Sequence, residues 1–418
     1  MTSPAAYLNL LRRNANFRRL WLAQIVSEIG DWFYSLAIYS LILELTGRAE
    51  LQALAVVVQV LPQTLIAPMA GVVNDRLSRR SVMIAADVAR VLIVLGMLFV
   101  RSRETVWLIY PLLLLETFCV AFFEPGRNAV IPSIVEEDEV LAANALSAAT
   151  WSFNLAVGAT LGGVVAVALG RDAVFILNAF SFLLSALLLR RMHFNEPHVD
   201  PAPLRLAELF NYTPILEGIR YIKRDSRLLA TVMVKGGLGF LGANLVLLPV
   251  LGERVFAVQA GGLDPKRGEM LAMSLLMGSR GIGALLAPFL TSPWARSDPK
   301  RLRIGILAGF LAAPIAYVIL SRAPSLGIAC LALVLAHGGG STIWVFSSTL
   351  LQLQTEDRFR GRVFAAELGM NTLTVSIFCY LIARVIDAGV PVRDVTLFAG
   401  LSLLIPATVW WLALRLWR

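Results

Sequence analysis

Several charged or titratable side chains of this sequence lie inside apolar runs. Asp31, Arg90, Glu116, Arg280 and His337 fall near the middle of runs of about 20 residues, the length that crosses a bilayer. A charge at such a depth costs about 2.5–3.5 kcal/mol on insertion scales, so these side chains are expected to face a cavity or one another. Their chemistry suits the binding of a polar group and the transfer of protons.

A second set of ionisable groups lies away from that level. Glu28, Asp87 and Lys235 are one or two helical turns from it, and Glu367 is closer to the end of its run. Glu28 and Asp31 are three residues apart and share one face of a helix. Two carboxylates in a poorly solvated cavity do not both stay ionised, which is the property that a proton relay requires.

Structural alternatives exist for some of these groups. Asp87 and Arg90 are also three residues apart and either take part in coupling or only neutralise each other. Arg384 and Asp387, at the end of another run, are expected to form a surface pair. The buried acids gather in the first half of the chain and the buried cations in the second, so charges of the two halves are expected to pair in one conformation and separate in another. The candidate proton-coupling and substrate-cavity residues are Glu28, Asp31, Asp87, Arg90, Glu116, Lys235, Arg280 and His337, the last of these otherwise being a hydrogen-bonded core residue.

The elements that position these residues are long apolar helices. The 418 residues are 57% hydrophobic and 16% charged, with a mean hydropathy of +0.72. This composition excludes a soluble enzyme, a disordered scaffold and a nucleic-acid-binding domain. Long runs in lipid must be helical, because every backbone group has to be bonded within its own segment. We predict twelve membrane-spanning helices, at 19–45, 51–73, 81–101, 105–124, 143–169, 173–190, 228–250, 269–291, 303–321, 325–348, 363–386 and 394–414.

The positive charges indicate how the chain is oriented. When the twelve spans alternate in direction, 24 of the 37 lysine and arginine residues fall on the side that holds both termini. The positive-inside rule therefore predicts that both termini are cytoplasmic. The net charge of +9 mostly reflects this orientation and not a surface for nucleic acid.

The longest polar stretch, 191–227, divides the chain into halves of six spans, 1–190 and 228–418. We interpret it as a cytoplasmic linker that contains Pro197, Pro201, Pro203 and Pro214, followed by a surface helix over 217–229. A weak internal repeat fits this division, because Leu-Ile-Ala-Pro at 65–68 recurs as Leu-Leu-Ala-Pro at 285–288. Two parallel repeats of six helices are the plan of one large transporter fold.

The loop between the second and third spans contains a spaced motif. It combines Gly71, Asp75, Arg76, Arg79 and Arg80 and resembles the signature loop of the major facilitator superfamily, with Ser78 where that family has a second glycine. The resemblance implies a gating loop that holds the cytoplasmic side shut in one state. Arg360, Gly361 and Arg362, between the tenth and eleventh spans, belong to a segment that resembles the same superfamily and complete the predicted gating residues.

Further segments resemble the drug- and siderophore-efflux branch of the superfamily, which includes enterobactin exporters and macrolide-efflux proteins. They are 27–32 in the first span, 122–127, 131–132 and 143–146 around the fourth and fifth spans, Asn178 in the sixth span, and 351–352 with 360–365. Residues 158–163 resemble the antiporter motif of the superfamily, although Ala159 replaces its usual proline. This resemblance implies a proton antiporter.

The sequence shows no P-loop, no metal-ligand spacing and no nucleophile–base constellation, so no ATP, metal, cofactor, nucleic acid or enzymatic activity is expected. Cys119, Cys330 and Cys379 lie in apolar runs and are expected to be core residues. The expected function is export of drug-, macrolide- or siderophore-like amphipathic small molecules by proton antiport. The expected site of action is the inner membrane of a bacterium, where the chain acts as a monomer and its partners are the substrate, protons and the lipid bilayer. Two alternatives remain open, a lysophospholipid flippase and a non-transporting membrane receptor or assembly partner.

Overall fold

A computed structural model describes residues 4–197, 199, 206–209, 212–259, 264–296 and 298–417. Every regular element within these ranges is a helix. Pro201 and Pro203 of the predicted linker lie outside the described residues, as do 198, 200, 202, 204–205, 210 and 211.

The membrane helices agree with the twelve predicted spans. Within the described ranges, eleven helical segments are long and apolar enough to cross a bilayer. The remaining prediction, the first span at 19–45, corresponds to the long helix α2, which contains Glu28 and Asp31. The helices are α2 (Ala15–Thr46), α3 (Ala49–Arg76), α4 (Arg79–Gly96), α5 (Ile109–Ile134), α6 (Val140–Leu169), α7 (Arg171–Arg190), α10 (Ser226–Leu238) followed by α11 (Asn244–Arg254), α12 (Pro265–Ala295), α13 (Pro299–Arg322), α14 (Leu326–Gln354), α15 (Arg360–Asp387), and α16 (Val392–Ser402) followed by α17 (Leu404–Ala413).

Three short helices lie outside these spans: α1 (Pro4–Arg13), α8 (Leu206–Leu209) and α9 (Thr213–Ile222). The surface helix predicted over 217–229 is interrupted, because α9 ends at Ile222 and α10 begins at Ser226. The break is caused by Asp225, whose carboxylate accepts hydrogen bonds from the backbone N–H groups of Arg227 and Leu228 and so starts a new helix.

The predicted end of the fourth span is also displaced. We predict a boundary at residue 124, but α5 continues through Pro125 as far as Ile134. The side chain of Asn74 on α3 donates a hydrogen bond of 3.0 Å to the carbonyl of Phe122, next to this proline. At Gly126 a Cβ atom would lie 2.6 Å from Oδ1 of Asn74, so a larger residue there would displace the Asn74 side chain.

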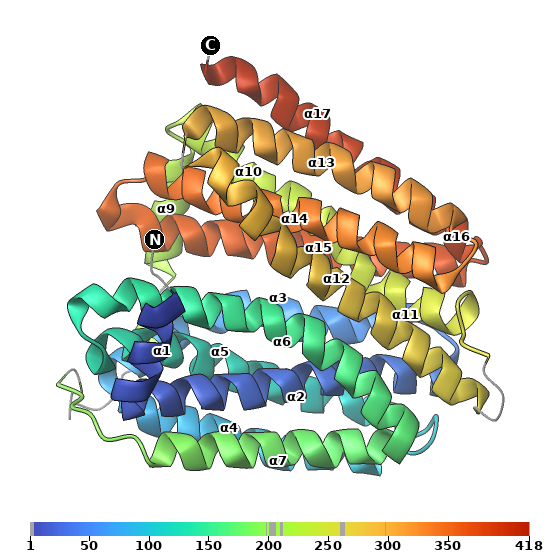
Figure 1. Ribbon diagram of the computed structural model, residues 1–418, viewed down its shortest axis with the longest axis horizontal. Helices are drawn as coiled ribbons and strands as arrows, with labels where there is room; N and C mark the ends of the chain where they lie inside the picture. Colours follow the sequence, from blue (N-terminus) through green and yellow to red (C-terminus); the bar gives the residue numbers. More distant parts are fainter. Residues whose placement is uncertain are drawn as a thin grey trace. The chain divides into compact units, whose positions relative to one another are not determined.

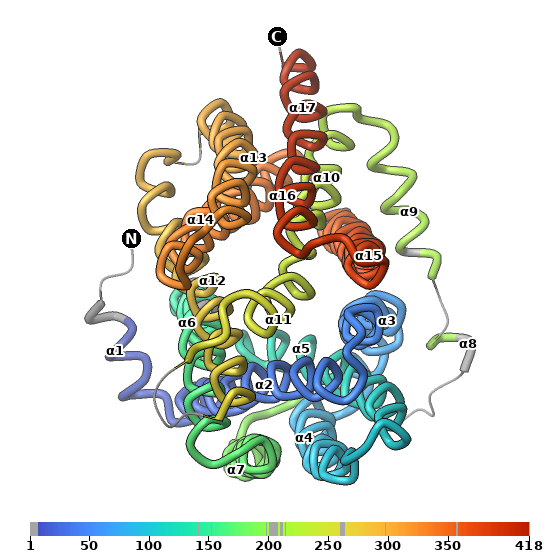
Figure 2. Tube along the Cα trace, turned by 90° about the vertical axis from the view of Figure 1, so that its right-hand side faces the viewer, coloured from blue at the N-terminus to red at the C-terminus, as the bar shows by residue number. Residues whose placement is uncertain are grey.

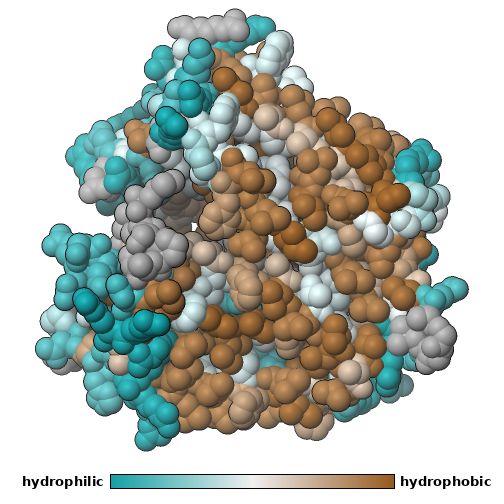
Figure 3. Space-filling model, viewed as in Figure 1, coloured by the Kyte–Doolittle hydropathy of each residue, from teal (hydrophilic) through white to brown (hydrophobic). Residues whose placement is uncertain are grey.

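The chain forms two compact units (Figures 1 and 2). Unit 1 consists of Met1–Ile38 and Leu65–Asn211, and unit 2 of Tyr39–Thr64 and Tyr212–Arg418. In unit 1, α4 packs against α5 and α7, and in unit 2, α14 packs against α12 and α13. On the face drawn in Figure 3, apolar side chains cover the middle of the helices and hydrophilic ones gather near the helix ends. Exposed apolar side chains such as Leu92, Leu290 and Leu331 are suited to contact with lipid.

The three cysteines are free: Cys379 is buried, and Cys119 and Cys330 are half-buried. In unit 2 the close packing of α13 on α14 depends on glycine. A Cβ at Gly339 would lie 2.9 Å from the carbonyl oxygen of Gly309, and a Cβ at Gly309 would lie 2.7 Å from that of Gly339. Small residues of this kind let two helix backbones approach closely in a membrane.

The packing of α13 on α14 predicts that replacing glycine with alanine has different effects on stability at two positions of α14. Gly339→Ala should lower the melting temperature, because overpacking costs about 1–3 kcal/mol. Gly327→Ala, where the new methyl meets open space, should leave it unchanged or raise it, because alanine is the better helix former. Thermal unfolding in detergent, followed by tryptophan fluorescence, checks this. Equal melting temperatures for both variants would contradict the packing argument.

Candidate functional site

The centre of unit 1 is a buried arginine shared by three carboxylates. Arg90 on α4, with a side chain that is 2% exposed, contacts Asp31 on α2 and Glu116 on α5. Its Nη2 lies 2.6 Å and 2.7 Å from the two Asp31 oxygens, and 2.9 Å from Oε1 of Glu116. Asp87, one turn earlier on α4, is fully buried and lies 3.7 Å from Nη1. The guanidinium also lies 3.8 Å from the centre of the Phe182 ring. If every group is ionised, the cluster has two excess negative charges.

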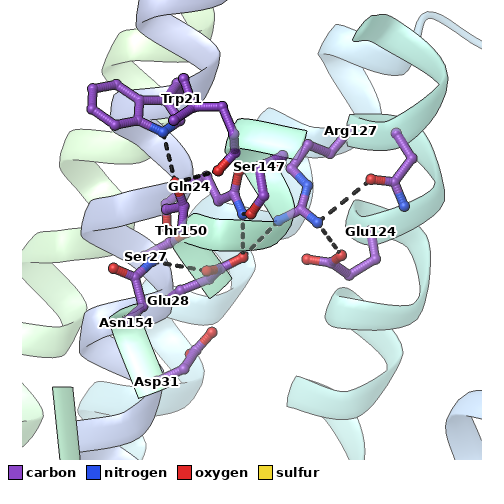
Figure 4. Close-up of polar contacts among 12 residues, drawn as sticks. Trp21, Gln24, Ser27, Glu28, Asp31, Glu124, Arg127, Ser147, Thr150 and Asn154 are labelled. Atoms are coloured by element: carbon purple, nitrogen blue, oxygen red, sulfur yellow. Dashed lines mark hydrogen bonds and ion pairs between the residues drawn. The ribbon is translucent and has the colours of Figure 1, made fainter. Parts of the chain in front are cut away.

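A second buried cluster surrounds Glu28, and Figure 4 shows it. Nη1 of Arg127 on α5 lies 2.7 Å from Oε1 of Glu28, and Nη2 of the same arginine lies 2.7 Å from Glu124. The amides of Gln24 and Asn154 donate hydrogen bonds of 2.9 Å and 2.8 Å to Glu28. The Glu28 carboxylate is therefore held by one guanidinium and two neutral donors, which fix its position.

The two clusters are adjacent along α2. Figure 4 shows Asp31 one turn from Glu28 on this helix, as expected for residues three apart. The structure thus brings Glu28, Asp31, Asp87, Arg90 and Glu116 together in unit 1 as a series of carboxylates bridged by two arginines.

Part of this network was not anticipated from the sequence. The additional members are Arg127, Glu124, Gln24, Ser147 and Asn154. A fourth span that ends at residue 124 leaves Arg127 in a loop. In the structure α5 continues past residue 124, and Arg127 is buried. Two spacings in the sequence could have predicted part of the network. Glu124 and Arg127 are three residues apart, and Gln24 and Glu28 are four apart, so each pair shares a helix face.

Lys235 lies in a separate buried site in unit 2. Its ammonium lies 3.4 Å from Glu367 on α15 and 3.0 Å from the hydroxyl of Ser348 on α14. It also lies 3.5 Å from the centre of the Trp344 ring, which favours a cation. This site has one charge of each sign, unlike the cluster around Arg90.

Arg280 on α12 and His337 on α14 are also in unit 2. The ionisable groups that interact with Arg280 include Tyr317, Tyr39 and Cys379. His337 is buried, and its Nε2 has no hydrogen bond within the described part of the chain. Across the same ranges no group of three or more His, Cys, Asp or Glu side chains is placed to hold a metal ion.

The gating-loop residues lie at the end of α3 and the start of α4. Asp75 is 77% exposed and contacts Arg79 at 3.7 Å, and Arg80 donates to the carbonyl of Met192 at 2.6 Å. Ser78, which replaces the glycine of the superfamily loop, is the N-cap of α4, and its hydroxyl lies 2.5 Å from Glu196. The departure from the family pattern therefore supplies a helix cap.

The remaining loop residues have partners on short helices or lie at helix ends. Arg76 forms a 2.8 Å ion pair with Glu208 on α8, and Arg362 forms a 2.6 Å ion pair with Glu217 on α9. Gly71 lies on α3, and Arg360 and Gly361 begin α15.

At the opposite end of the membrane helices, α15 caps α3 within unit 2. The Asp387 carboxylate accepts hydrogen bonds of 2.9 Å from the backbone N–H groups of both Ala49 and Glu50. The Glu50 carboxylate in turn accepts from Tyr380 at 2.7 Å and from Arg384 at 3.3 Å. The predicted surface pair of Arg384 and Asp387 is wrong, because both side chains bind the start of α3 instead.

Comparisons with solved structures identify the fold. The chain superposes on a bacterial homolog of the human lysosomal transporter Spinster, with a TM-score of 0.70 at 14% identity over 99% of this chain and 98% of the other. This similarity and the twelve helices define the fold of the major facilitator transporters. The sequence matches the transmembrane secretion effectors over residues 6–389, and the chain belongs to this family.

Curated relatives include efflux proteins. The chain is 26% identical to a putative bacilysin exporter of Bacillus amyloliquefaciens over 80% of its own length and 79% of the relative's. A macrolide efflux protein of Streptococcus pyogenes is 32% identical over 30% of this chain and 31% of its own. The match to an uncharacterized transporter of Bacillus subtilis, at 26% identity, spans 54% of this chain and about half of that protein, 53%. The chain thus belongs to a family of multi-pass membrane transporters, not enzymes, and two of these relatives are named for export or efflux.

The buried pair of unit 2 generates a stability prediction. Lys235→Met leaves Glu367 buried without its cation, which should lower the free energy of unfolding by about 3–5 kcal/mol. Adding Glu367→Met removes the isolated charge and should restore most of that loss. Denaturant titration in mixed micelles measures both values. A double variant that is less stable than the single one would contradict this account of the pair.

Proposed function

We propose that this chain exports amphipathic small molecules in exchange for protons, by alternating access in a bacterial cytoplasmic membrane with both termini inside. The single observation that carries the proposal is the network of five carboxylates and two arginines in unit 1. Most of its members are buried between membrane helices, where uncompensated charge is costly.

The excess negative charge gives the network its affinity for protons. Three carboxylates share the single guanidinium of Arg90, so binding of a proton removes part of a charge that the apolar surroundings do not solvate. Asp31 is the member best placed to exchange that proton, because its side chain is 33% exposed whereas Arg90 and Asp87 are buried. Glu28 lies one turn away and is the second carrier.

The substrate class is supported by relatives and by composition. The relatives named above as bacilysin and macrolide exporters favour an amphipathic small molecule. Cargo of a drug-, macrolide- or siderophore-like kind fits a transporter with acidic groups inside an apolar helix bundle. We propose that the chain works as a monomer and that Lys235, Arg280 and His337 contribute polar contacts from unit 2.

Coupling should depend on Asp31 and Glu28. Asp31→Asn or Glu28→Gln should abolish substrate-driven proton release from proteoliposomes, or reduce it at least tenfold, while substrate binding persists. Glu104→Gln removes the same charge from an exposed loop position and is the matched control. The measurement is the pH change of an entrapped dye after substrate addition. Wild-type proton release by both network variants would exclude this assignment.

The same liposomes test the two alternative functions. A lysophospholipid flippase would move a fluorescent lysophospholipid between leaflets and show no substrate-driven proton release. A receptor or assembly partner would move none of these compounds. Either result would replace the proposed antiport.

The gating loop gives a further prediction. We propose that Asp75 holds the cytoplasmic ends of the helices shut in one conformation of the transporter. In the structure its side chain is 77% exposed and contacts Arg79. Asp75→Asn should abolish transport with little effect on melting temperature, because Asp75 has few contacts to lose here. Efflux of a dye from cells, at protein levels matched to wild type, measures this. Wild-type efflux by Asp75→Asn would disprove the gating role.

A further inference from the structure

An apolar groove of about 380 Å³ lies on unit 2 between α10, α13, α15 and α17. Its walls are formed mainly by aliphatic and aromatic side chains, among them Leu229, Met233, Ile405 and Val409. Leu229 and Met233 are exposed at one wall, and Ile405 and Val409 at another. The groove therefore opens on the surface where lipid surrounds the protein.

The groove runs lengthwise along α10. On α10 its lining extends from Ser226, at the start of the helix, to Gly237. The eleven steps from one residue to the next over this stretch correspond to about 17 Å at 1.5 Å per residue. This length exceeds half of a hydrocarbon core of about 30 Å, so the groove is about as long as one leaflet is thick. An extended acyl chain fits such a shape.

Two arginines, here called the basic rim, lie close to the end of the groove at Ser226: Arg227 follows Ser226 in the chain, and the carbonyl of Arg303 accepts a hydrogen bond from the groove residue Trp410. The Nε of Arg227 donates to the carbonyl of Leu416 at 2.8 Å, and the Arg303 guanidinium lies 5.0 Å from the centre of the Trp417 ring. Both guanidiniums are thus held against the same C-terminal segment, close enough for their charges to interact. Arg415, over the ring of Trp411, adds a third positive charge to that segment.

Two carboxylates near the basic rim accept hydrogen bonds from backbone N–H groups in the first turns of helices. Asp225 accepts from the N–H groups of Arg227 and Leu228, and Asp298 accepts from those of Lys300 and Arg301. Trp410, a groove residue, donates its indole N–H to the carbonyl of Arg303 at 3.0 Å and so joins the apolar wall to the basic rim.

We propose that this groove binds an anionic phospholipid, with one acyl chain along α10 and α17 and the phosphate between Arg227 and Arg303. A phosphate there offsets the repulsion of two like charges and uses the planar geometry of guanidinium groups. Basic pockets between membrane helices, next to interfacial tryptophans, are suited to such headgroups. The lipid is a bound partner and not the transported substrate, so the proposal does not depend on proton antiport.

The test measures lipid retention by the purified, delipidated full chain. Phosphatidylglycerol and phosphatidylcholine with the same acyl chains are added in turn, and bound lipid is counted by native mass spectrometry. The wild type should retain phosphatidylglycerol in preference. Arg227→Gln with Arg303→Gln should weaken that binding about 25-fold, on the basis of about fivefold per basic residue at a membrane surface. Arg12→Gln with Arg13→Gln removes the same charge from exposed sites of unit 1 and should change nothing.

Two further variants keep the test decisive if the double arginine variant does not fold. Ser226→Glu puts a negative charge at the rim, on an exposed first-turn position where a helix accepts an acid, and should abolish the preference for phosphatidylglycerol. Ala230→Phe fills the groove without changing charge and should reduce retention of both lipids. Equal retention of the two lipids by wild type, or unchanged retention in Ser226→Glu and Ala230→Phe, would overturn the proposal. Binding of glycerol phosphate as tight as that of the whole lipid would also overturn it.

Discussion

The organisation of unit 1 depends on one requirement, that a guanidinium buried among membrane helices must be compensated by groups from several of them. Arg90 satisfies this with Asp31 from α2, Glu116 from α5 and Asp87 from its own helix, while Phe182 of α7 covers its face. Four helices are thereby held to one side chain. Since removing one partner of a buried ionic group leaves the others uncompensated, any change of charge at this point must change how these helices pack.

The two units compensate their buried charges in different ways. In unit 2 the Lys235–Glu367 pair is balanced and is completed by Ser348 and the ring of Trp344. In unit 1 carboxylates outnumber guanidiniums in both clusters. A balanced pair has no reason to bind a further ion, whereas an unbalanced cluster does. This difference, more than the number of buried charges, supports the proposal that protons are exchanged in unit 1.

The fold was predictable from the sequence because long apolar runs leave the backbone no alternative to helix in lipid. The spacing of Glu28 and Asp31 on one helix face was equally visible. Partners on other helices were not, because local spacing does not show which carboxylate meets Arg90. The fourth span was predicted to end at residue 124, although Asn74 from another helix donates to the chain beside Pro125 and α5 continues. Asp387 was paired with its sequence neighbour Arg384, whereas it binds Ala49, more than 300 residues away.

The cap that Asp387 places on α3 has a consequence for how that end of the helices responds to the surrounding solution. It consists of two hydrogen bonds from backbone N–H groups to a carboxylate near the surface, and water can replace both at a cost of about 1 kcal/mol each. The adjoining contacts of Glu50 with Arg384 and Arg48 are ion pairs between partly exposed groups, which dissolved salt screens. The Arg90 cluster is buried and is screened much less. Ionic strength on that side of the membrane therefore acts on the contact between the start of α3 and α15 without altering the charges at the centre of unit 1.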